Sequence, residues 1–341
     1  MRFSIIIPSF NQGRFIGRTL RSILQQDYGP AQIIVADGGS TDNTLAVLRS
    51  FGERVTWWSE PDGGFADAVN KALPLVDGDI VGIQSSDDFY LPGAFAAVAR
   101  QFADHPKLGV VSGSDLTIDL DYRIVAVGPA CGPITTENLF PVGLPQHATF
   151  ARSTVLRALR GLRSDVDLCA DADLWFRAAH HYEGRRFADF IAVYQAHPAQ
   201  RTSTLPNFSA ALARVIEDAE QDRTLGGRFR FRPEDKAAII RFFNIHWKSP
   251  QGRDLAEKSR LARAEIPSVR RSRNIPLRLE LARYARFTLA SRTSQLLFVM
   301  KNGLLLPLLR HKARLHRARR RAAKLDLRWT ERTPMPAGSG R

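Results

Sequence analysis

The choice of fold is limited most by four short apolar runs in the first ninety residues. Each run is followed directly by small or acidic residues. The runs cover residues 3–7, 33–36, 55–58 and 80–83, with segments of helical spacing between them. A continuous apolar run of this length predicts a strand that is buried on both faces. Strands that alternate with helices predict an α/β fold with a doubly wound, mostly parallel sheet.

The polar residues that follow these runs should meet at one edge of the sheet. They occupy residues 8–11, 37–40, 59–62 and 85–88. Ligands of open α/β sheets bind beyond the carboxyl ends of the strands, so we expect the functional site at this edge. No GxGxxG or GxxxxGK[ST] loop is present, which argues against a Rossmann dinucleotide site and a P-loop. Acidic residues near a phosphate would need a divalent cation between them.

The Asp87–Asp88 pair directly follows the fourth run and precedes Pro92, where a new helix is expected. Two adjacent carboxylates at a strand end can bind a metal ion and a sugar hydroxyl. The alternative is a helix N-cap, which Asp commonly provides. Taken alone, the pair favours the cap.

Seven segments in order resemble the motifs of the family 2 glycosyltransferases, which have the GT-A fold. The resemblance covers residues 1 to about 205, the predicted GT-A domain. The segments are residues 5–11 (IIIPSFN), 36–42 (ADGGSTD), 59–64 (SEPDGG, with DA at 67–68 and NK at 70–71), 86–90 (SDDFY), 145–150 (PQHATF), 170–177 (ADADLWFR) and 197–203 (HPAQRTS).

The resemblance implies a nucleotide-sugar donor site. Asp37 would hydrogen-bond the base, expected to be uracil, and the backbone of Pro8 and Ser9 would pack on the nucleotide. Asp87 would contact the ribose or the donor sugar. Asp88 would coordinate Mg²⁺ or Mn²⁺ that bridges the diphosphate.

Further donor-side residues follow from the same resemblance. Asp62, Asn70 and Lys71 are expected to contact the donor, although a solvated helix face is the alternative for the last two. His197 is expected to join the metal or the diphosphate, since imidazole suits either task. The family's Asp-x-Asp motif begins here with Ser86, so its first carboxylate is replaced.

On the acceptor side, Asp171 matches the family's general base, and Ala170 takes the place of the acidic residue that usually precedes it. One base opposite the leaving group gives inversion at the anomeric carbon. His147 is expected on the acceptor side, with an ordinary polar strand residue as the alternative. Asp173 is expected to pair with Arg177 at spacing i, i+4 instead of taking part in catalysis.

The C-terminal third carries the net charge. The chain has 49 Lys and Arg against 34 Asp and Glu, a net charge of +15, and residues 270–328 alone hold 17 basic and two acidic residues. Cations among apolar residues favour a helix on an anionic membrane surface. No nucleic acid is expected, because residues 311–324 contain no aromatic residue. A surface for a partner protein is the other alternative.

Three regions are therefore predicted: the GT-A domain at 1–205, a largely helical basic region at 206–332 and a disordered tail at 333–341. The two cysteines suit a reducing compartment, and the start of the chain lacks a signal-peptide pattern. The longest apolar stretch, residues 296–309, is shorter than the roughly 20 residues needed to span a bilayer. We expect a cytoplasmic protein, peripheral on the inner face of the cell membrane.

The predicted function is that of an inverting, metal-dependent glycosyltransferase. It would move a sugar from a nucleotide-diphospho-sugar to a glycan or lipid-linked acceptor in surface polysaccharide or glycolipid synthesis. One alternative is a non-catalytic membrane- or nucleic-acid-binding protein on a degenerate GT-A scaffold. A nucleotidyltransferase is another, although it would need a basic Gly-rich loop after the first strand.

Overall fold

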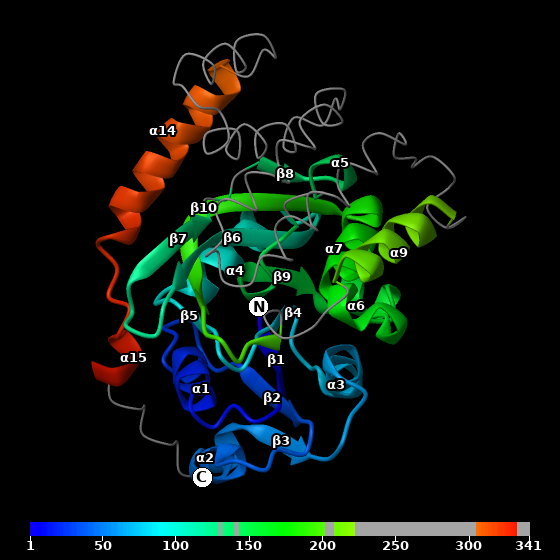
Figure 1. The fold of residues 1–341 in the computed structure, drawn as a ribbon, viewed down its shortest axis with the longest axis vertical. Coiled ribbons are helices and arrows are strands. Elements are labelled where there is room, and N and C mark those ends of the chain that lie inside the picture. Colours follow the sequence, from blue (N-terminus) through cyan, green and yellow to red (C-terminus); the bar gives the residue numbers. More distant parts are fainter. Residues whose placement is uncertain (129, 131, 140–142, 202–207, 222–304, 333–341) are drawn as a thin grey trace. The chain divides into compact units, whose positions relative to one another are not determined.

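The computed structural model describes residues 1–128, 130, 132–139, 143–201, 208–221 and 305–332 (Figure 1). The chain divides into two compact units. The first comprises residues 1–135, 144–197 and 318–341, and the second comprises residues 136–143 and 198–317. In its described part, the second unit contains α5 (Thr136–Leu139), α9 (Phe208–Gln221) and the first part of α14 (Leu305–Ala322).

The first unit is built on one sheet, to which the described residues contribute ten strands. Along the sheet the order is β3 (Thr56–Ser59), β2 (Gln32–Asp37), β1 (Phe3–Ser9), β4 (Ile80–Ile83), β9 (Thr149–Arg152), β6 (Leu108–Ile118), β10 (Glu183–Gln195) and β5 (Phe89–Tyr90). Two further strands lie off this path: β7 (Ile124–Gly128) pairs with β6, and β8 (Gly132–Ile134) pairs with β10.

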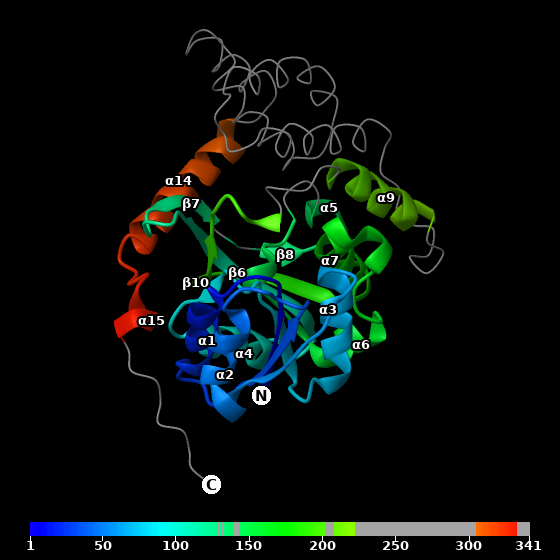
Figure 2. The same ribbon diagram turned by 60° about the horizontal axis from the view of Figure 1, so that its bottom comes forward.

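The first four strands confirm the doubly wound prediction. β1 pairs in parallel with both β2 and β4, and β2 pairs in parallel with β3. Helices α1 (Ile16–Leu24) and α3 (Phe65–Ala72) lie on opposite sides of β1 and β2 in both views (Figures 1 and 2). The polar carboxyl ends of these strands therefore share one edge, as expected.

The second half of the sheet is mixed, in contrast to the mostly parallel sheet that was expected. β9 lies between β4 and β6 and is antiparallel to both. β10 is parallel to β6 but antiparallel to β5 and β8. Strand β6 continues to Ile118 although Ser112 and Ser114 interrupt its apolar pattern, and both serines are buried.

The other helices of this unit are α2 (Thr44–Ser50), α4 (Ala94–Asp104), α6 (Ser153–Ala158), α7 (Ala170–His181) and α15 (Trp329–Arg332). Aromatic rings fill the core beneath α4: the Phe3 ring stacks on Phe95 at 4.5 Å between centroids, and Phe150 packs edge-on against both. Burial of such rings stabilises the fold and fixes the strands whose ends form the site.

The C-terminal residues of the described chain belong to the first unit, although the sequence placed them in a separate region at 206–332. Ala322 is buried in a cluster with Phe89 and Leu91, and Leu325 and Leu327 pack against this cluster. Of the predicted membrane-binding segment, residues 270–304 lie outside the described residues, as does the predicted tail at 333–341. Within the described residues, no helix combines the length and the apolar character that crossing a bilayer requires.

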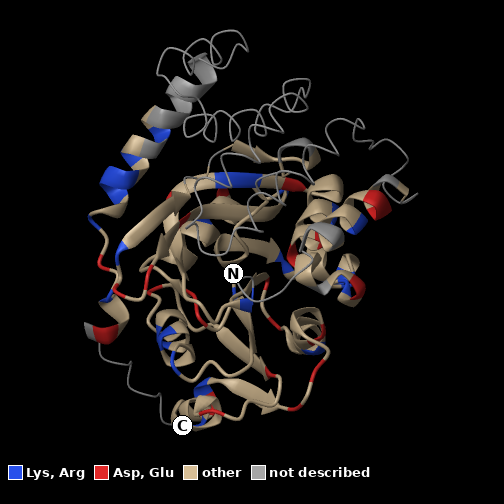
Figure 3. Cartoon of the chain, viewed as in Figure 1, with Lys and Arg blue, Asp and Glu red and all other residues tan. Residues whose placement is uncertain are grey.

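Lys and Arg residues are concentrated on the second half of α14 (Figure 3). Exposed residues on this helix include Arg314, Arg317, Arg319, Arg320 and Arg321. A helix of this composition presents a cationic surface to its surroundings.

Candidate functional site

Asp37, the last residue of β2, is buried and its carboxylate is held from two sides. The carboxylate accepts hydrogen bonds from the backbone N–H of Ser40 at 2.8 Å, from the Ser40 hydroxyl at 2.5 Å and from the Ser59 hydroxyl at 2.6 Å. Ser59 is the last residue of β3, so Asp37 ties two strand ends together. These bonds fix the direction of its carboxylate.

The loop after β1 is joined to the loop after β2. The Gly38 N–H donates to the Ser9 carbonyl at 2.8 Å, and the Asn11 N–H donates to the Ser40 hydroxyl at 2.7 Å. The hydroxyl of Ser9 is buried and has no hydrogen-bond partner among the described residues, and the same is true of the Gln84 amide just after β4. Buried polar atoms of this kind need a partner such as water or a ligand.

Asp62 follows β3 and approaches the same loops. Its Oδ2 lies 2.9 Å from the point that a Cβ on Gly38 would occupy, so a side chain there would displace the Asp62 carboxylate. Its Oδ1 accepts a hydrogen bond from the Gly64 N–H at 2.8 Å. The structure therefore brings Asp62 beside the Asp37 loop.

Asn70 and Lys71, both on α3, make other contacts. The Asn70 amide exchanges two hydrogen bonds, of 2.7 and 2.9 Å, with the backbone of Leu162. The Lys71 ammonium lies 3.2 Å from Glu60 and 3.2 Å from Asp67 on the surface. These contacts hold the chain around α3, and donor contacts of either residue remain a prediction.

The Asp87–Asp88 pair is not a helix cap. Helix α4 begins at Ala94 after Gly93, whose left-handed backbone (φ 75°) provides the N-cap without a side-chain hydrogen bond. Asp88 Oδ1 instead accepts a hydrogen bond from the Gln195 N–H at 2.9 Å. Asp87 Oδ2 lies 2.9 Å from Nε2 of His197. The cap interpretation is therefore wrong; Asp88 is buried and Asp87 is half-buried.

The surroundings of Asp88 disfavour the charged form of its carboxyl group. Burial, and then the charge of Asp87, raise the pKa of Asp88 to about 8, against smaller opposing effects of His147 and of the Gln195 N–H. Burial acts to lower the pKa of His147, but its hydrogen bond to Asp115 and the nearby carboxylates raise the pKa overall. A bound cation would stabilise the ionised form of such a carboxylate, because a nearby positive charge lowers its pKa.

His147 is more deeply placed than a surface acceptor residue would be. It lies in a single 3-10 turn before β9, is buried, and contacts Asp115 through Nε2 at 3.3 Å. Its Nδ1 is 3.9 Å from Asp88, and its ring centroid lies 5.6 Å from that of Tyr194. The structure thus brings His147 to the carboxylate pair, and its acceptor role remains a prediction.

Asp171 lies in the first turn of α7, where the helix dipole favours a negative charge. Burial raises the pKa of its carboxyl group, and the backbone N–H groups of Ala172 and Asp171 oppose this. Asp173 pairs with Arg177 at 2.7 Å, which confirms the structural role predicted for it. Of the two carboxylates in the first turn of α7, Asp173 forms salt bridges with arginines. No salt bridge of Asp171 with an arginine is found among the described residues.

Four residues around the carboxylate pair were not predicted from the sequence: Arg18, Gln195, Asp115 and Tyr122. Arg18 is on α1, is buried, and donates a hydrogen bond to the Asp87 carbonyl at 3.0 Å. The available signal was that Arg18 directly precedes Thr19, which is buried on the same turn of α1. A charged residue rarely faces a core without a partner, so such an arginine indicates a buried contact. Gln195 and Tyr122 carried no signal in their local sequence.

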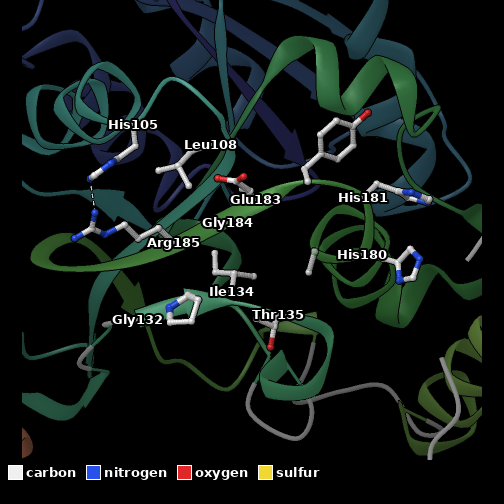
Figure 4. Close-up of a pocket in the computed structure, with 13 residues that line it drawn as sticks. His105, Leu108, Gly132, Ile134, Thr135, His180, His181, Glu183, Gly184 and Arg185 are labelled. Atoms are coloured by element: carbon white, nitrogen blue, oxygen red, sulfur yellow. Dashed lines mark hydrogen bonds between the residues drawn. The ribbon is translucent and has the colours of Figure 1, made fainter. Parts of the chain in front are cut away.

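A cavity of about 760 Å³ lies elsewhere, at the strand ends where β6 and β10 begin (Figure 4). Its lining includes His105, Arg185, His180, His181 and Glu183, and none of the predicted site residues. Because β6 runs in the direction of β1 and β4, these starting ends lie opposite the edge that carries Asp37 and Asp88.

The comparisons with known proteins agree with this architecture. Residues 4–138 match the family model described as glycosyl transferase family 2. An uncharacterized glycosyltransferase of Mycobacterium tuberculosis is 31% identical over 183 residues, which are 52% of this chain and 68% of the relative. The chain belongs to glycosyltransferase family 2. This membership favours an enzyme over the non-catalytic scaffold and over the nucleotidyltransferase.

Other relatives of this glycosyltransferase are much longer. A chondroitin synthase and a hyaluronan synthase of Pasteurella multocida are each 27% identical over 177 residues, and the match spans 51% of this chain but only 18% of theirs.

Solved structures share the fold at low identity, which confirms its GT-A type. Residues 1–349 of S. aureus TarS, in complex with UDP-GlcNAc, superpose with a TM-score of 0.56 at 18% identity, over 84% of this chain and 88% of that TarS fragment. The mannosyltransferase PcManGT of Pyrobaculum calidifontis, in complex with GDP-Man and Mn²⁺, gives 0.53 at 19% identity, over 90% and 86%.

Proposed function

We propose that this glycosyltransferase is an inverting, metal-dependent enzyme that transfers a sugar from a nucleotide-diphospho-sugar, expected to be UDP-linked, to a hydroxyl of a glycan or lipid-linked acceptor. The observation that carries the proposal is the shared sheet edge. There the fixed carboxylate of Asp37 ends strand β2 and the Asp87–Asp88 pair follows strand β4, and β1 lies between these two parallel strands.

The donor would lie along this edge. Asp37 would accept a hydrogen bond from the base, the Pro8–Ser9 backbone would pack against the nucleotide, and Asp87 would contact the ribose or sugar. The buried Ser9 hydroxyl, which lacks a partner among the described residues, supports a ligand here. UDP-GlcNAc and GDP-Man, the ligands of the two structural neighbours, support a nucleotide-sugar donor.

Asp88 would hold Mn²⁺ or Mg²⁺, with His197 beside it through Asp87. The described residues contain no cluster of three His, Cys, Asp or Glu side chains suited to a metal. One or two carboxylates nevertheless fit such an ion, since diphosphate and water oxygens commonly complete its shell. When bound, the ion neutralises the charge that develops on the leaving diphosphate.

Asp171 would act as the general base. The acceptor oxygen attacks the anomeric carbon while the bond from that carbon to the diphosphate oxygen breaks and its electron pair leaves with the diphosphate. The acceptor proton passes to the Asp171 carboxylate. A raised pKa makes this carboxylate a stronger base than an ordinary aspartate.

The cellular setting proposed is the cytoplasmic, inner face of the cell membrane, in the synthesis of a surface polysaccharide or glycolipid of the cell envelope. The basic segment 270–328 would hold the enzyme on anionic lipid as a peripheral protein. The exposed arginines of α14 support this role, because each cation near an anionic surface contributes about 1 kcal/mol.

A thermal-shift panel of UDP-, GDP-, dTDP- and CMP-sugars, each with and without MnCl₂, tests the proposal. We expect stabilisation by a UDP-sugar that is larger with Mn²⁺, and loss of the Mn²⁺ effect in Asp88→Asn. Asp121→Asn, an exposed carboxylate on the β6–β7 turn, serves as the control. No stabilisation of the wild-type chain by any nucleotide sugar would overturn the proposed function.

A further inference from the structure

Arg18 is the buried centre of a hydrogen-bond network behind the Asp87–Asp88 pair. Its Nη2 donates to the Asp87 carbonyl at 3.0 Å, and its Nη1 donates to the Gln195 side chain at 2.7 Å. The guanidinium also lies over the Phe89 ring, 4.3 Å from the centroid. The residues before and after Asp88 are therefore both held by one side chain.

Gln195 links Arg18 to the other carboxylate. While its side-chain oxygen accepts from Arg18, its backbone N–H donates to Asp88 Oδ1 at 2.9 Å. Its side-chain nitrogen donates to the Asp119 carbonyl at 2.6 Å. One guanidinium thus contacts Asp87 directly and Asp88 through a single residue.

Tyr122 lies on the other side of Arg18. Its hydroxyl accepts a hydrogen bond from Arg18 Nη1 at 3.2 Å and donates one to Glu331 at 2.6 Å. Tyr122 has a left-handed backbone (φ 63°), which is costly for an aromatic residue. The turn around Asp119, whose carboxylate accepts from two backbone N–H groups, holds it there.

Glu331 comes from the C-terminal segment 318–332, whose helix α15 lies beside α1 (Figure 1). The indole N–H of Trp329 donates to the Tyr90 carbonyl at 3.3 Å, two residues after Asp88. The Arg328 guanidinium lies 4.7 Å from the centroid of the Tyr122 ring. This segment therefore covers the network that reaches the carboxylate pair.

We propose that Arg18 is a positioning residue for Asp87 and Asp88, and that Tyr122 and Glu331 hold its guanidinium in place. Segment 318–332 is then a working part of the donor site. The guanidinium suits this task because its planar fork donates in several fixed directions, which a lysine ammonium does not. This inference rests on the proposed function, since it takes the pair as the site of the donor diphosphate and its metal.

The test uses full-length variants and measures binding of UDP and of GDP, each with MnCl₂, by calorimetry, together with thermal unfolding of the nucleotide-free protein. Arg18→Lys should weaken binding about tenfold or more, as expected when hydrogen bonds of a charged group are lost. Tyr122→Phe keeps the ring and loses only the hydroxyl. It should weaken binding roughly fivefold, as should Glu331→Ala.

Because Tyr122 and Glu331 act through one hydrogen bond, their double variant should bind about as weakly as either single variant. Arg123→Gln, an exposed neighbour of Tyr122, is the control and should bind as the wild type does.

Normal affinity in folded Arg18→Lys and Tyr122→Phe would overturn the inference, and so would a lower unfolding temperature with unchanged affinity, because that is a purely structural role. Failure of the wild-type chain to bind UDP, GDP or any nucleotide sugar of the thermal-shift panel would instead overturn the proposed function, and the inference with it.

Discussion

Nε2 of His197 lies 2.9 Å from Oδ2 of Asp87, although 110 residues separate the two in the chain. The His197 ring also stacks on Phe15, with 4.5 Å between centroids. The imidazole is thereby held between the loop after β1 and the carboxylate pair. From this position we expect His197 to orient the Asp87 carboxylate toward the proposed donor.

His197→Ala should lower kcat/KM for the donor by roughly tenfold to a hundredfold, the range for losing a hydrogen bond to a charged group. Steady-state kinetics with the donor from the nucleotide-sugar panel measures this. His180→Ala, which lies at the cavity on the opposite sheet edge, should leave the kinetics unchanged. Equal losses in both variants would show that the effect is not specific to the Asp87 contact.

Asp88→Asn should abolish turnover and remove the gain in nucleotide affinity that Mn²⁺ provides. An amide cannot supply the negative charge that an Mn²⁺–diphosphate pair requires. Calorimetry of UDP with MnCl₂, and again with EDTA in place of the metal, measures the effect. A folded variant that still binds UDP more tightly with Mn²⁺ would place the metal elsewhere.

Asp171→Asn should retain donor binding but lose a factor of about 10² to 10⁴ in transfer, the usual contribution of a general base. Donor binding is followed by calorimetry and transfer by release of the nucleoside diphosphate. Glu53→Gln, a conservative change at an exposed residue before β3, is the control. Near-normal transfer by Asp171→Asn would show that another group accepts the proton.

The pH dependence of transfer should reflect Asp171. A base must be deprotonated to work, so activity should fall as the pH drops through the pKa of Asp171. Because burial raises that pKa, the fall should begin at a higher pH than for an ordinary aspartate. The acid limb of the kcat profile at saturating donor and metal measures this pKa. A limb at the ordinary aspartate value would contradict the assignment.

The arginines at 319–321 should contribute to binding of anionic vesicles. Substitution is a better test than truncation, because residues 318–332 pack in the first unit and their removal would expose its core. Changing all three to Glu in the full chain should weaken cosedimentation with vesicles containing phosphatidylserine. Wild-type binding should also weaken with salt, because the Debye length is only about 8 Å near physiological ionic strength.

Two results would contradict the proposal that the basic segment holds the protein on anionic lipid. Equal binding to neutral vesicles would assign the interaction to the apolar residues 296–309. Absence of binding to either vesicle together with tight RNA binding would assign the basic segment to nucleic acid.

The sequence alone determined the first half of the sheet and the edge at which the predicted site residues lie. The run at residues 80–83 became β4 with the predicted bounds, and the Asp87–Asp88 pair followed it at the expected edge. Such features are local, because buried strands require continuous apolar residues and parallel strands bring their carboxyl ends together. Periodicity within a few residues was enough to predict them.

Tertiary structure decided what each carboxylate contacts. Asp88 accepts its hydrogen bond from Gln195, 107 residues away, and Tyr122 donates to Glu331 across 209 residues. Neither contact has a local signature, because hydrogen bonds of this separation form only when packing brings distant elements together. The same holds for β9, whose insertion between β4 and β6 made the second half of the sheet mixed. The candidate site residues could thus be predicted from the sequence, but their hydrogen-bond partners depended on how the whole first unit packs.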